Sequence, residues 1–329
     1  MTERIQNSKF KISIMSLFSI ILTVSGLCLF EIISSIDNAI INAEVLSTMG
    51  AKARRWFLIW GLLFAVFIIR GLLPWMIVWL STPGVGPIES LFATFSGDPK
   101  VLSAVEQASP VLLIGGGTFL IFLFFHWIFL ETKNYGLKGE RFIHSKGIWF
   151  FAVVSILLAM IVWFALKADP IMAFGAVVGS SAFFITHGFK ENAEQSEKQL
   201  MQKHMSDLSK ILYLEVIDAT FSIDGVLGAF AFTLSVPLIL LGNGLGAFVL
   251  REITIGNIER IKKYKYLKNG AMYSILVLGV VMLLDSFHFE IPSYVSPLLT
   301  FGVVGYFLWK SIKELKIENE KLVLDNDRG

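Results

Sequence analysis

The chain contains apolar runs that a soluble fold of its size would not need. Residues 111–130 read VLLIGGGTFLIFLFFHWIFL and contain one ionisable side chain, that of His126. A helix of about 20 such residues crosses the hydrocarbon core of a bilayer, and several other runs approach this length. Charged residues make up 16% of the 329 residues, whereas an ordinary soluble domain has about 25%. We therefore expect an all-α, polytopic helical membrane protein in contact with the lipid bilayer.

Hydropathy predicts nine transmembrane helices. Their approximate ranges are 12–47, 55–80, 110–131, 148–166, 170–189, 210–234, 236–258, 269–286 and 292–311. The first range is longer than a straight crossing of about 30 Å requires, so we expect this helix to tilt, break or project. Segment 81–109, which is rich in Gly, Pro and polar residues, is predicted to be an extramembrane loop with a short interfacial helix.

Positive charges follow the odd-numbered spans. The alternate connections contain only Lys100 and Lys167, while the N-terminal Arg4, Lys9 and Lys11 oppose the trend and are outnumbered. Cytoplasmic loops carry the excess of Lys and Arg. We therefore expect a multi-pass protein of the bacterial plasma (inner) membrane, with its N-terminus outside and its C-terminus in the cytoplasm.

Two distant segments share one pattern of acids. Residues 30–41 read FEIISSIDNAII and residues 217–228 read IDATFSIDGVLG. Each has an acid, five residues and a second acid that follows Ser-Ile. The aligned pairs are Glu31 with Asp218, Ser35 with Ser222, and Asp37 with Asp224.

The repeat continues into the next helix of each half. Residues 61–70 read GLLFAVFIIR and residues 242–251 read GNGLGAFVLR, so that Arg70 aligns with Arg251. Five spans separate the start of the first unit from the start of the second. Because this number is odd, the second unit has the opposite orientation in the membrane. Inverted repeats with a site at their interface are the recurring plan of secondary transporters.

This pattern predicts two membrane halves with a seam between them. The expected units are a first half, 1–189, with acid motif 31–38 and arginine helix 55–80; a cytoplasmic linker, 190–209; a second half, 210–312, with acid motif 215–225 and arginine helix 236–258; and a cytoplasmic tail, 313–329.

The buried acids indicate a cation site. An ionised side chain at the centre of a membrane helix costs about 2.5–3.5 kcal/mol, so these acids must be protonated, paired or bound to cations. Two arginines cannot neutralise all of them, and oxygen ligands suit Mg, Ca or Mn. Several carboxylates together also permit proton exchange. The acids are Glu31, Asp37, Glu215, Asp218 and Asp224.

Helix geometry limits how these acids can meet. Positions i and i+6 lie about 240° apart around a helix, so a continuous helix cannot aim Glu31 and Asp37 at one point. Either each acid-bearing helix is broken or kinked near Ser-Ile-Asp, or the second acids lie on a separate path. Gly225 and Gly228 favour a break in the second helix, and Asn38 does so less strongly in the first. One face is shared by Glu31, Ser35, Asn38 and Asn42, and another by Glu215, Asp218 and Ser222.

Three segments resemble the TerC/Alx family of integral membrane proteins. They are FEIISSIDNAIINAEVL, LEVIDATFSIDGVLGAF and GLLFAVFIIRG. The resemblance implies an inverted-repeat transporter associated with manganese export and tellurium-compound resistance. It also implies that the metal ligands are Glu31, Asp37, Asn38, Asp218 and Asp224. We expect supporting roles for Ser35, Ser222, Glu215, Arg70 and Arg251. Gly225 stands where the family often has Ser, so the architecture transfers more safely than the substrate.

The leading functional hypothesis is a secondary transporter that exports a divalent cation by alternating access. Mn²⁺ is the first candidate substrate and Ca²⁺ the next. Exchange for protons is one way in which the export could be driven. The partners expected are the metal ion and the lipid bilayer, with no nucleic acid, and a homo-oligomer is compatible with this hypothesis. No enzyme activity and no permanently bound cofactor are expected. The single cysteine, Cys28, excludes an internal disulfide.

Two other classes compete with transport. An intramembrane aspartyl hydrolase needs its Asp in a Gly-x-Gly-Asp setting, whereas Asp224 follows Phe-Ser-Ile. A non-transporting membrane subunit of a metal or tellurite stress-resistance assembly would depend on partners and on the 190–209 linker. Two residue roles also stay open: Arg70 and Arg251 either gate the site or pack between helices, and His126 either relays protons or bonds a neighbouring helix.

Overall fold

The structure is a computed structural model. The residues that it describes are 17–61, 64–82, 84–92, 99–200, 206–261 and 263–326. Within these ranges every regular element is a helix, which confirms the predicted all-α class. In the same ranges, six helices are long and apolar enough to cross a membrane, so the predicted number of nine is not confirmed. These six are Leu17–Ser34, Ser103–Leu130, Gly147–Ala168, Pro170–Phe189, Leu267–Ser286 and Val295–Glu318.

The first predicted span breaks at Ser35. Helix α2 (Leu17–Ser34) ends there and α3 (Ile36–Ser47) begins one residue later. Ser35 has φ −97° and ψ 6°, yet its N–H still donates to the carbonyl of Glu31 at 3.1 Å. The interruption is therefore a local irregularity of the backbone at one residue, because the carbonyl of Ser35 also accepts from Ala39 N at 2.9 Å.

The second predicted span is a chain of short segments, much of it π-helical. These are α4 (Ala51–Trp56), η1 (Phe57–Gly61), η2 (Ala65–Leu72) and α6 (Leu73–Ser81). A π-helical turn inserts an extra residue into the helix, is rare, and is frequent at functional sites. Here it includes Arg70.

The middle of the chain forms the core of the bundle. After α7 (Pro87–Leu91), which is the short helix predicted within 81–109, α8 begins earlier than expected. The helices that follow are α8 (Pro99–Leu130), α9 (Glu140–His144), η4 (Gly147–Trp149), α10 (Phe150–Ala168) and α11 (Pro170–Leu200). Helix α11 continues through residues 190–200, so this part of the predicted linker is helical.

The second half has longer helices. They are α12 (Asp207–Ala229), α13 (Val236–Ile261), α14 (Leu267–Ser286) and α15 (Val295–Asn326). The break predicted in the second acid-bearing helix is absent, because α12 is continuous through Gly225 and Gly228. These glycines serve packing instead. A Cβ added at Gly225 would lie 3.1 Å from Glu31 Oε2, and one at Gly228 would overlap the ring of Phe30.

Helix α8 is the centre of the bundle. The most apolar window of α8 is 83% buried, whereas that of the segment Gly147–Ala168 is only 22% buried. Glycines allow close approach on two sides: a Cβ at Gly117 would lie 2.9 Å from the carbonyl oxygen of Gly279 on α14, and one at Gly115 would lie 2.9 Å from that of Gly175 on α11. Small residues at such contacts are typical of helix packing in membranes.

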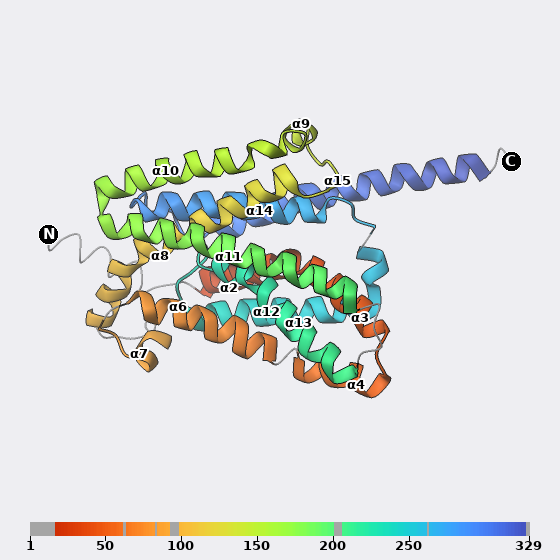
Figure 1. The fold of residues 1–329 in the computed structure, drawn as a ribbon, viewed down its shortest axis with the longest axis horizontal. Helices are drawn as coiled ribbons and strands as arrows, with labels where there is room; N and C mark the ends of the chain where they lie inside the picture. Colours follow the sequence, from red (N-terminus) through yellow and green to blue (C-terminus); the bar gives the residue numbers. More distant parts are fainter. Residues whose placement is uncertain are drawn as a thin grey trace.

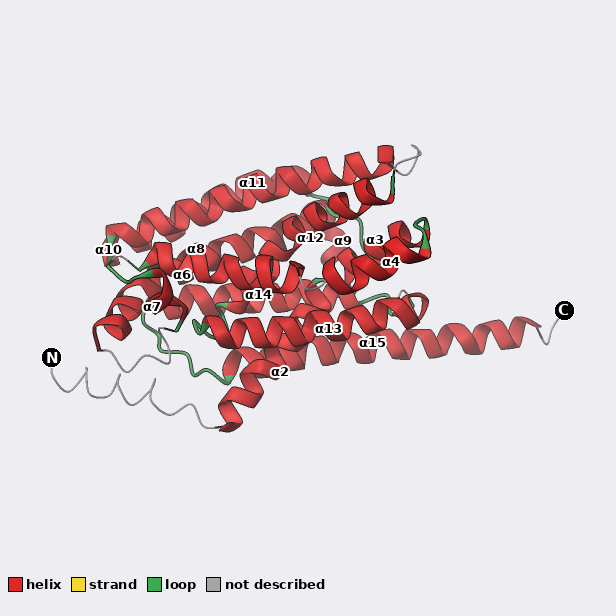
Figure 2. Cartoon of the chain, turned by 90° about the horizontal axis from the view of Figure 1, so that it is seen from below, coloured by secondary structure: helices red, strands yellow, loops and turns green. Residues whose placement is uncertain are grey.

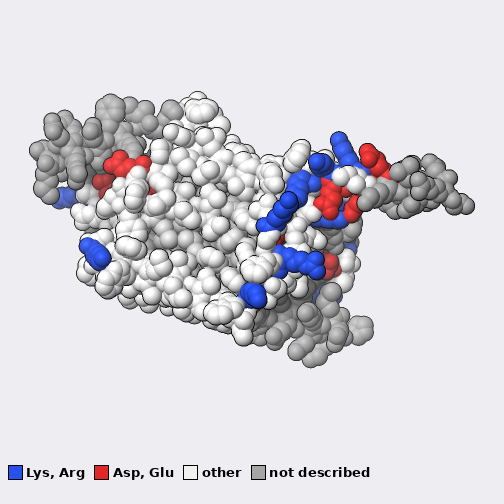
Figure 3. Space-filling view, turned by 90° about the horizontal axis from the view of Figure 1, so that it is seen from above, with Lys and Arg blue, Asp and Glu red and all other residues white. Residues whose placement is uncertain are grey.

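The surface fits a membrane environment. Figure 1 shows the helices side by side along the long axis, with α15 extending beyond the others at the end where α3 and α4 lie; Figure 2 shows the same projection from below. On the face in Figure 3, Lys and Arg gather mainly at that end, and the middle of the molecule carries no charge. Large apolar side chains such as Trp163 and Phe174 are 61% and 68% exposed.

Candidate cation site

Arg70 joins the two acid-bearing helices. Its Nε donates to Glu31 Oε1 at 2.7 Å, and its Nη1 donates to Asp218 Oδ2 at 3.1 Å. All three residues are buried, with 3%, 1% and 8% of their surfaces exposed. The structure thus brings together the first acids of the two sequence repeats and places a single guanidinium between them.

Polar side chains hold these acids in place. Ser35 Oγ donates to Glu31 Oε1 at 2.8 Å, and Asn38 Nδ2 donates to Asp218 Oδ1 across the two halves. Ser222 Oγ donates at 2.6 Å to the main-chain carbonyl of Asp218 rather than to its carboxylate. The aligned serines therefore have different roles, since only Ser35 contacts an acid side chain.

Small residues on α13 allow Glu31 to be buried. A Cβ added at Gly246 would lie 2.6 Å from the Cβ of Glu31, and one at Gly242 would lie 2.5 Å from the Cβ of Leu27. The GNGLG segment of the second arginine helix therefore packs tightly on α2. This contact explains why glycines precede Arg251 in the repeat.

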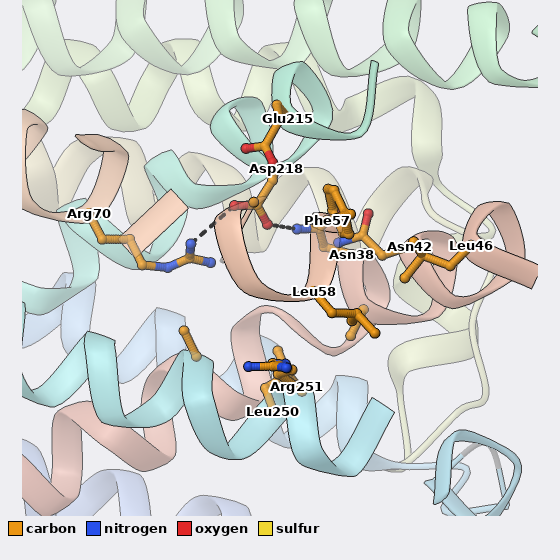
Figure 4. Close-up of a pocket in the computed structure, with 13 residues that line it drawn as sticks. Asn38, Asn42, Leu46, Phe57, Leu58, Arg70, Glu215, Asp218, Leu250 and Arg251 are labelled. Carbon is orange, nitrogen blue, oxygen red and sulfur yellow. Dashed lines mark hydrogen bonds and ion pairs between the residues drawn. The ribbon is translucent and has the colours of Figure 1, made fainter. Parts of the chain in front are cut away.

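A cavity of about 80 Å³ opens beside the Arg70 ion pairs. Glu215 lines it from α12, and both of its carboxylate oxygens are buried without a hydrogen-bond partner (Figure 4). Gly61 makes room for this carboxylate, because a Cβ at Gly61 would overlap Glu215 Oε1. Other lining residues are Asn38, Asn42, Phe57, Leu58, Asp218, Leu250 and Arg251.

Further polar atoms that line this cavity also lack partners. They are Oδ1 of Asn38, Oδ1 of Asn42 and Nε of Arg251. Buried polar groups are almost always hydrogen-bonded, to protein or to water. A group of such atoms around one cavity is chemically suited to water, an ion or another polar ligand.

The second acids of the repeats are not placed at this site. The side chain of Asp37 lies outside the described residues, and Asp224 is half-buried on α12 without lining the cavity. Because α12 is continuous, Asp224 is about 240° around the helix from Asp218. Among the described residues no group of three or more His, Cys, Asp and Glu is positioned to hold a metal ion.

Sequence reasoning underestimated two cavity residues. The sequence assigns Glu215 only a supporting role and Asn42 only a position on the helix face of Glu31, yet both line the cavity with unsatisfied oxygens. The sequence feature that pointed to Glu215 is Gly61, which aligns with Gly242 in the repeat and packs on Glu215.

Two further polar clusters lie outside the site. Glu140, 1% exposed, accepts from Gly136 N at 2.7 Å and from Tyr273 Oη at 3.0 Å, and so fixes the loop after α8 to α14. The rings of His126 and His187 lie 3.8 Å apart, and His126 Nδ1 lies 3.6 Å from Glu131 Oε1. His126 therefore packs against His187 of α11, and its Nδ1 makes no hydrogen bond among the described residues.

Comparison with known proteins adds a family but no named activity. The model of a family described as "Protein of unknown function (DUF475)" matches residues 36–318. The chain is 32% identical over 82 residues to the "Uncharacterized membrane protein YceF" of Bacillus subtilis, which covers 25% of this chain and 32% of that protein. It is 27% identical over 105 residues to the "Uncharacterized membrane protein RP786" of Rickettsia prowazekii, which covers 30% of this chain and 35% of that protein.

The chain therefore spans about a third of the length of the curated relatives it matches. No solved structure matches it.

Proposed function

The chain belongs to the DUF475 family, and we propose that it is a secondary transporter that exports a divalent cation from a bacterial cytoplasm by alternating access. The substrate proposed first is Mn²⁺, followed by Ca²⁺. The observation that carries the proposal is the placement of Arg70 between Glu31 and Asp218, acids from the two sequence repeats.

Charge compensation supports this proposal. Two buried carboxylates require a positive partner, because unpaired ionised groups are costly in a membrane. Arg70 provides that charge in the present arrangement, at 2.7 Å from Glu31 and 3.1 Å from Asp218. A divalent cation that binds the two acids would displace the guanidinium. Arg70 then acts as an internal counter-ion that holds the empty carrier together, which is the gating role considered from the sequence.

The second arginine supplies a counterpart for Arg70 in the opposite half of the transport cycle. Arg251 is the repeat counterpart of Arg70, yet its Nε has no hydrogen-bond partner and it lines the cavity. Inverted repeats exchange conformations between the two faces of a transporter. In the oppositely facing state we expect Arg251 to approach the acids and Arg70 to leave them.

The oxygen ligands favour a hard cation. Carboxylates and amide oxygens suit Mn²⁺, Ca²⁺ or Mg²⁺. The resemblance of three segments to the TerC/Alx family favours Mn²⁺ and implies Asp37, Asn38 and Asp224 as further ligands. Asp224 would have to join Glu31 and Asp218 in another conformation, because here it lies about 240° around α12 from Asp218. The proposed location is the plasma membrane, with the charged end that carries the projecting part of α15 in the cytoplasm (Figure 3).

Flux into proteoliposomes tests the proposal. Purified protein should carry radioactive Mn²⁺ faster than empty liposomes, with and without an imposed pH gradient. Glu31→Gln and Asp218→Asn should abolish the flux, while Glu252→Gln, which neutralises an exposed acid on α13, should leave it unchanged. Mn²⁺ and Ca²⁺ fluxes equal to those of empty liposomes under both conditions would exclude transport of these ions.

A further inference from the structure

The cavity beside Arg70 has a mostly apolar wall in which a few acceptor oxygens lack partners, and the guanidinium groups of Arg70 and Arg251 also line it. Four of its oxygen atoms have no hydrogen-bond partner: both carboxylate oxygens of Glu215, and Oδ1 of Asn38 and of Asn42. One nitrogen, Nε of Arg251, is also unpartnered. Asn38 is 3% exposed, and its Nδ2 donates to Asp218. A flip of the Asn38 amide, which would turn Nδ2 instead of Oδ1 toward the cavity, would break that hydrogen bond. Such a set of oxygens attracts a cation.

Charge counting indicates how much positive charge is missing. The described ionisable side chains around the site are the acids Glu31, Asp218 and Glu215 and the bases Arg70 and Arg251. When all five are ionised, three negative and two positive charges leave one negative charge uncompensated. Because Glu31 and Asp218 are both bonded to Arg70, the free carboxylate is that of Glu215. A single positive charge bound at Glu215 would bring the net charge of these five side chains to zero.

The size of the cavity suits a small ion that retains some water. About 10–15 Å³ of such space is enough for one water molecule, and this cavity has about 80 Å³. Gly61 keeps the space in front of Glu215 Oε1 free of any side-chain atom of its own. The site is therefore shaped by backbone as well as by its polar side chains.

We propose that Glu215, Asn42 and Asn38 bind one monovalent cation, of the sodium class, in a site separate from the Glu31–Arg70–Asp218 cluster. This site is available while Arg70 still holds the two acids, so it can be filled before the divalent substrate arrives. Its role as a coupling-ion site rests on the proposed transport function, but the binding itself does not.

Equilibrium binding of ²²Na⁺ to the purified full-length protein in detergent tests the site. Wild-type protein should bind Na⁺ saturably, and K⁺ at equal concentration should compete weakly. Glu215→Gln should weaken binding by about tenfold or more, which corresponds to about 1.4 kcal/mol. Asn42→Ala should weaken it less, because it removes one neutral ligand. Glu252→Gln serves as the matched control and should bind as wild type.

Two results would overturn the assignment. They are no saturable Na⁺ binding by folded wild-type protein, and equal binding by wild type and Glu215→Gln. If Glu215→Gln does not fold, as judged by its elution profile and thermal unfolding, Asn42→Ala decides between the outcomes. Sodium binding without Mn²⁺ flux would refute only the transport proposal, and Mn²⁺ flux without sodium binding would refute only this site.

Discussion

Arg70 Nη1 lies 3.1 Å from Asp218 Oδ2, although 148 residues separate them in the sequence. The same guanidinium donates to Glu31 from Nε. Arg70 is therefore the physical link between the two repeats at the level of their first acids. Arginine suits this position because its planar group carries several donors in a fixed arrangement and stays charged when buried.

Removal of that link should destabilise the protein strongly. Arg70→Gln leaves Glu31 and Asp218 buried without a cation, and breaking a buried ion pair costs about 3–5 kcal/mol. We expect a large drop in the thermal unfolding temperature in detergent. Millimolar Mn²⁺ should restore part of the loss, because a divalent cation replaces the missing charge.

Arg251→Gln is the matched control for Arg70→Gln. The Nε of Arg251 has no partner and the residue is only half-buried, so the substitution should change the unfolding temperature little. Equal destabilisation by the two substitutions, or no recovery of Arg70→Gln with Mn²⁺, would contradict the role assigned to Arg70.

Gly61→Ala should disturb the cavity without disturbing the fold at large. The added methyl would overlap Glu215 Oε1 and force that carboxylate to move. We expect cation binding and flux to fall, while helix content and elution profile stay close to wild type. Gly305→Ala is the control, since a Cβ at Gly305 meets nothing within 4 Å. The same loss with Gly305→Ala would show that the effect is not local to Glu215.

The sequence was sufficient to predict that Glu31 and Asp218 are equivalent, because a repeated acid spacing in apolar surroundings is rarely accidental. It also predicted the break after Glu31, which occurs at Ser35. The predicted break in α12 is wrong, because the helix is continuous through Gly225 and Gly228. Backbone freedom alone cannot distinguish a break from close packing, and here the packing of α2 against both glycines keeps the helix intact.

The role of Glu215 depends on information that one sequence does not contain. Its helical face was predictable, but its lack of a partner follows from the route of the π-helical second span and from the contact with Gly61. Likewise, Arg70 and Arg251 are equivalent in the sequence repeat and differ in the structure. Only Arg70 is bonded to the first acids, whereas Arg251 lines the cavity beside them.

Outside the membrane-spanning helices, Lys133 should make stability depend on alkaline pH. Burial lowers the pKa of its ammonium from the ordinary value of 10.5 to about 8. The folded state therefore favours the neutral amine, and between about pH 8 and 10.5 the unfolded chain binds more protons. The contribution of this group to stability is complete above about pH 10.5 and is lost as the pH falls towards 8.

Comparison of wild type with Lys133→Met isolates this effect. The difference in unfolding temperature between the two proteins should change between pH 8 and 10.5, with wild type gaining as the pH rises. The difference should be constant below pH 8, where Lys133 is protonated in both states. A constant difference across the whole range would mean that Lys133 is not buried as the structure places it, beside Trp127 at 4.3 Å.

Bound Mn²⁺ should exchange places with Arg70. An anomalous-scattering map from crystals soaked in Mn²⁺ should show a peak between Glu31 and Asp218, with the guanidinium withdrawn from both. Asp37→Asn and Asp224→Asn should weaken the peak if these second acids complete the ligand set, whereas Glu252→Gln should leave it unchanged. A peak that forms while Arg70 still donates to both first acids, or saturating Mn²⁺ without any peak there, would place the substrate elsewhere. In that event the Arg70 cluster would be a structural bridge between the halves, because a counter-ion that never leaves its acids cannot make room for a cation.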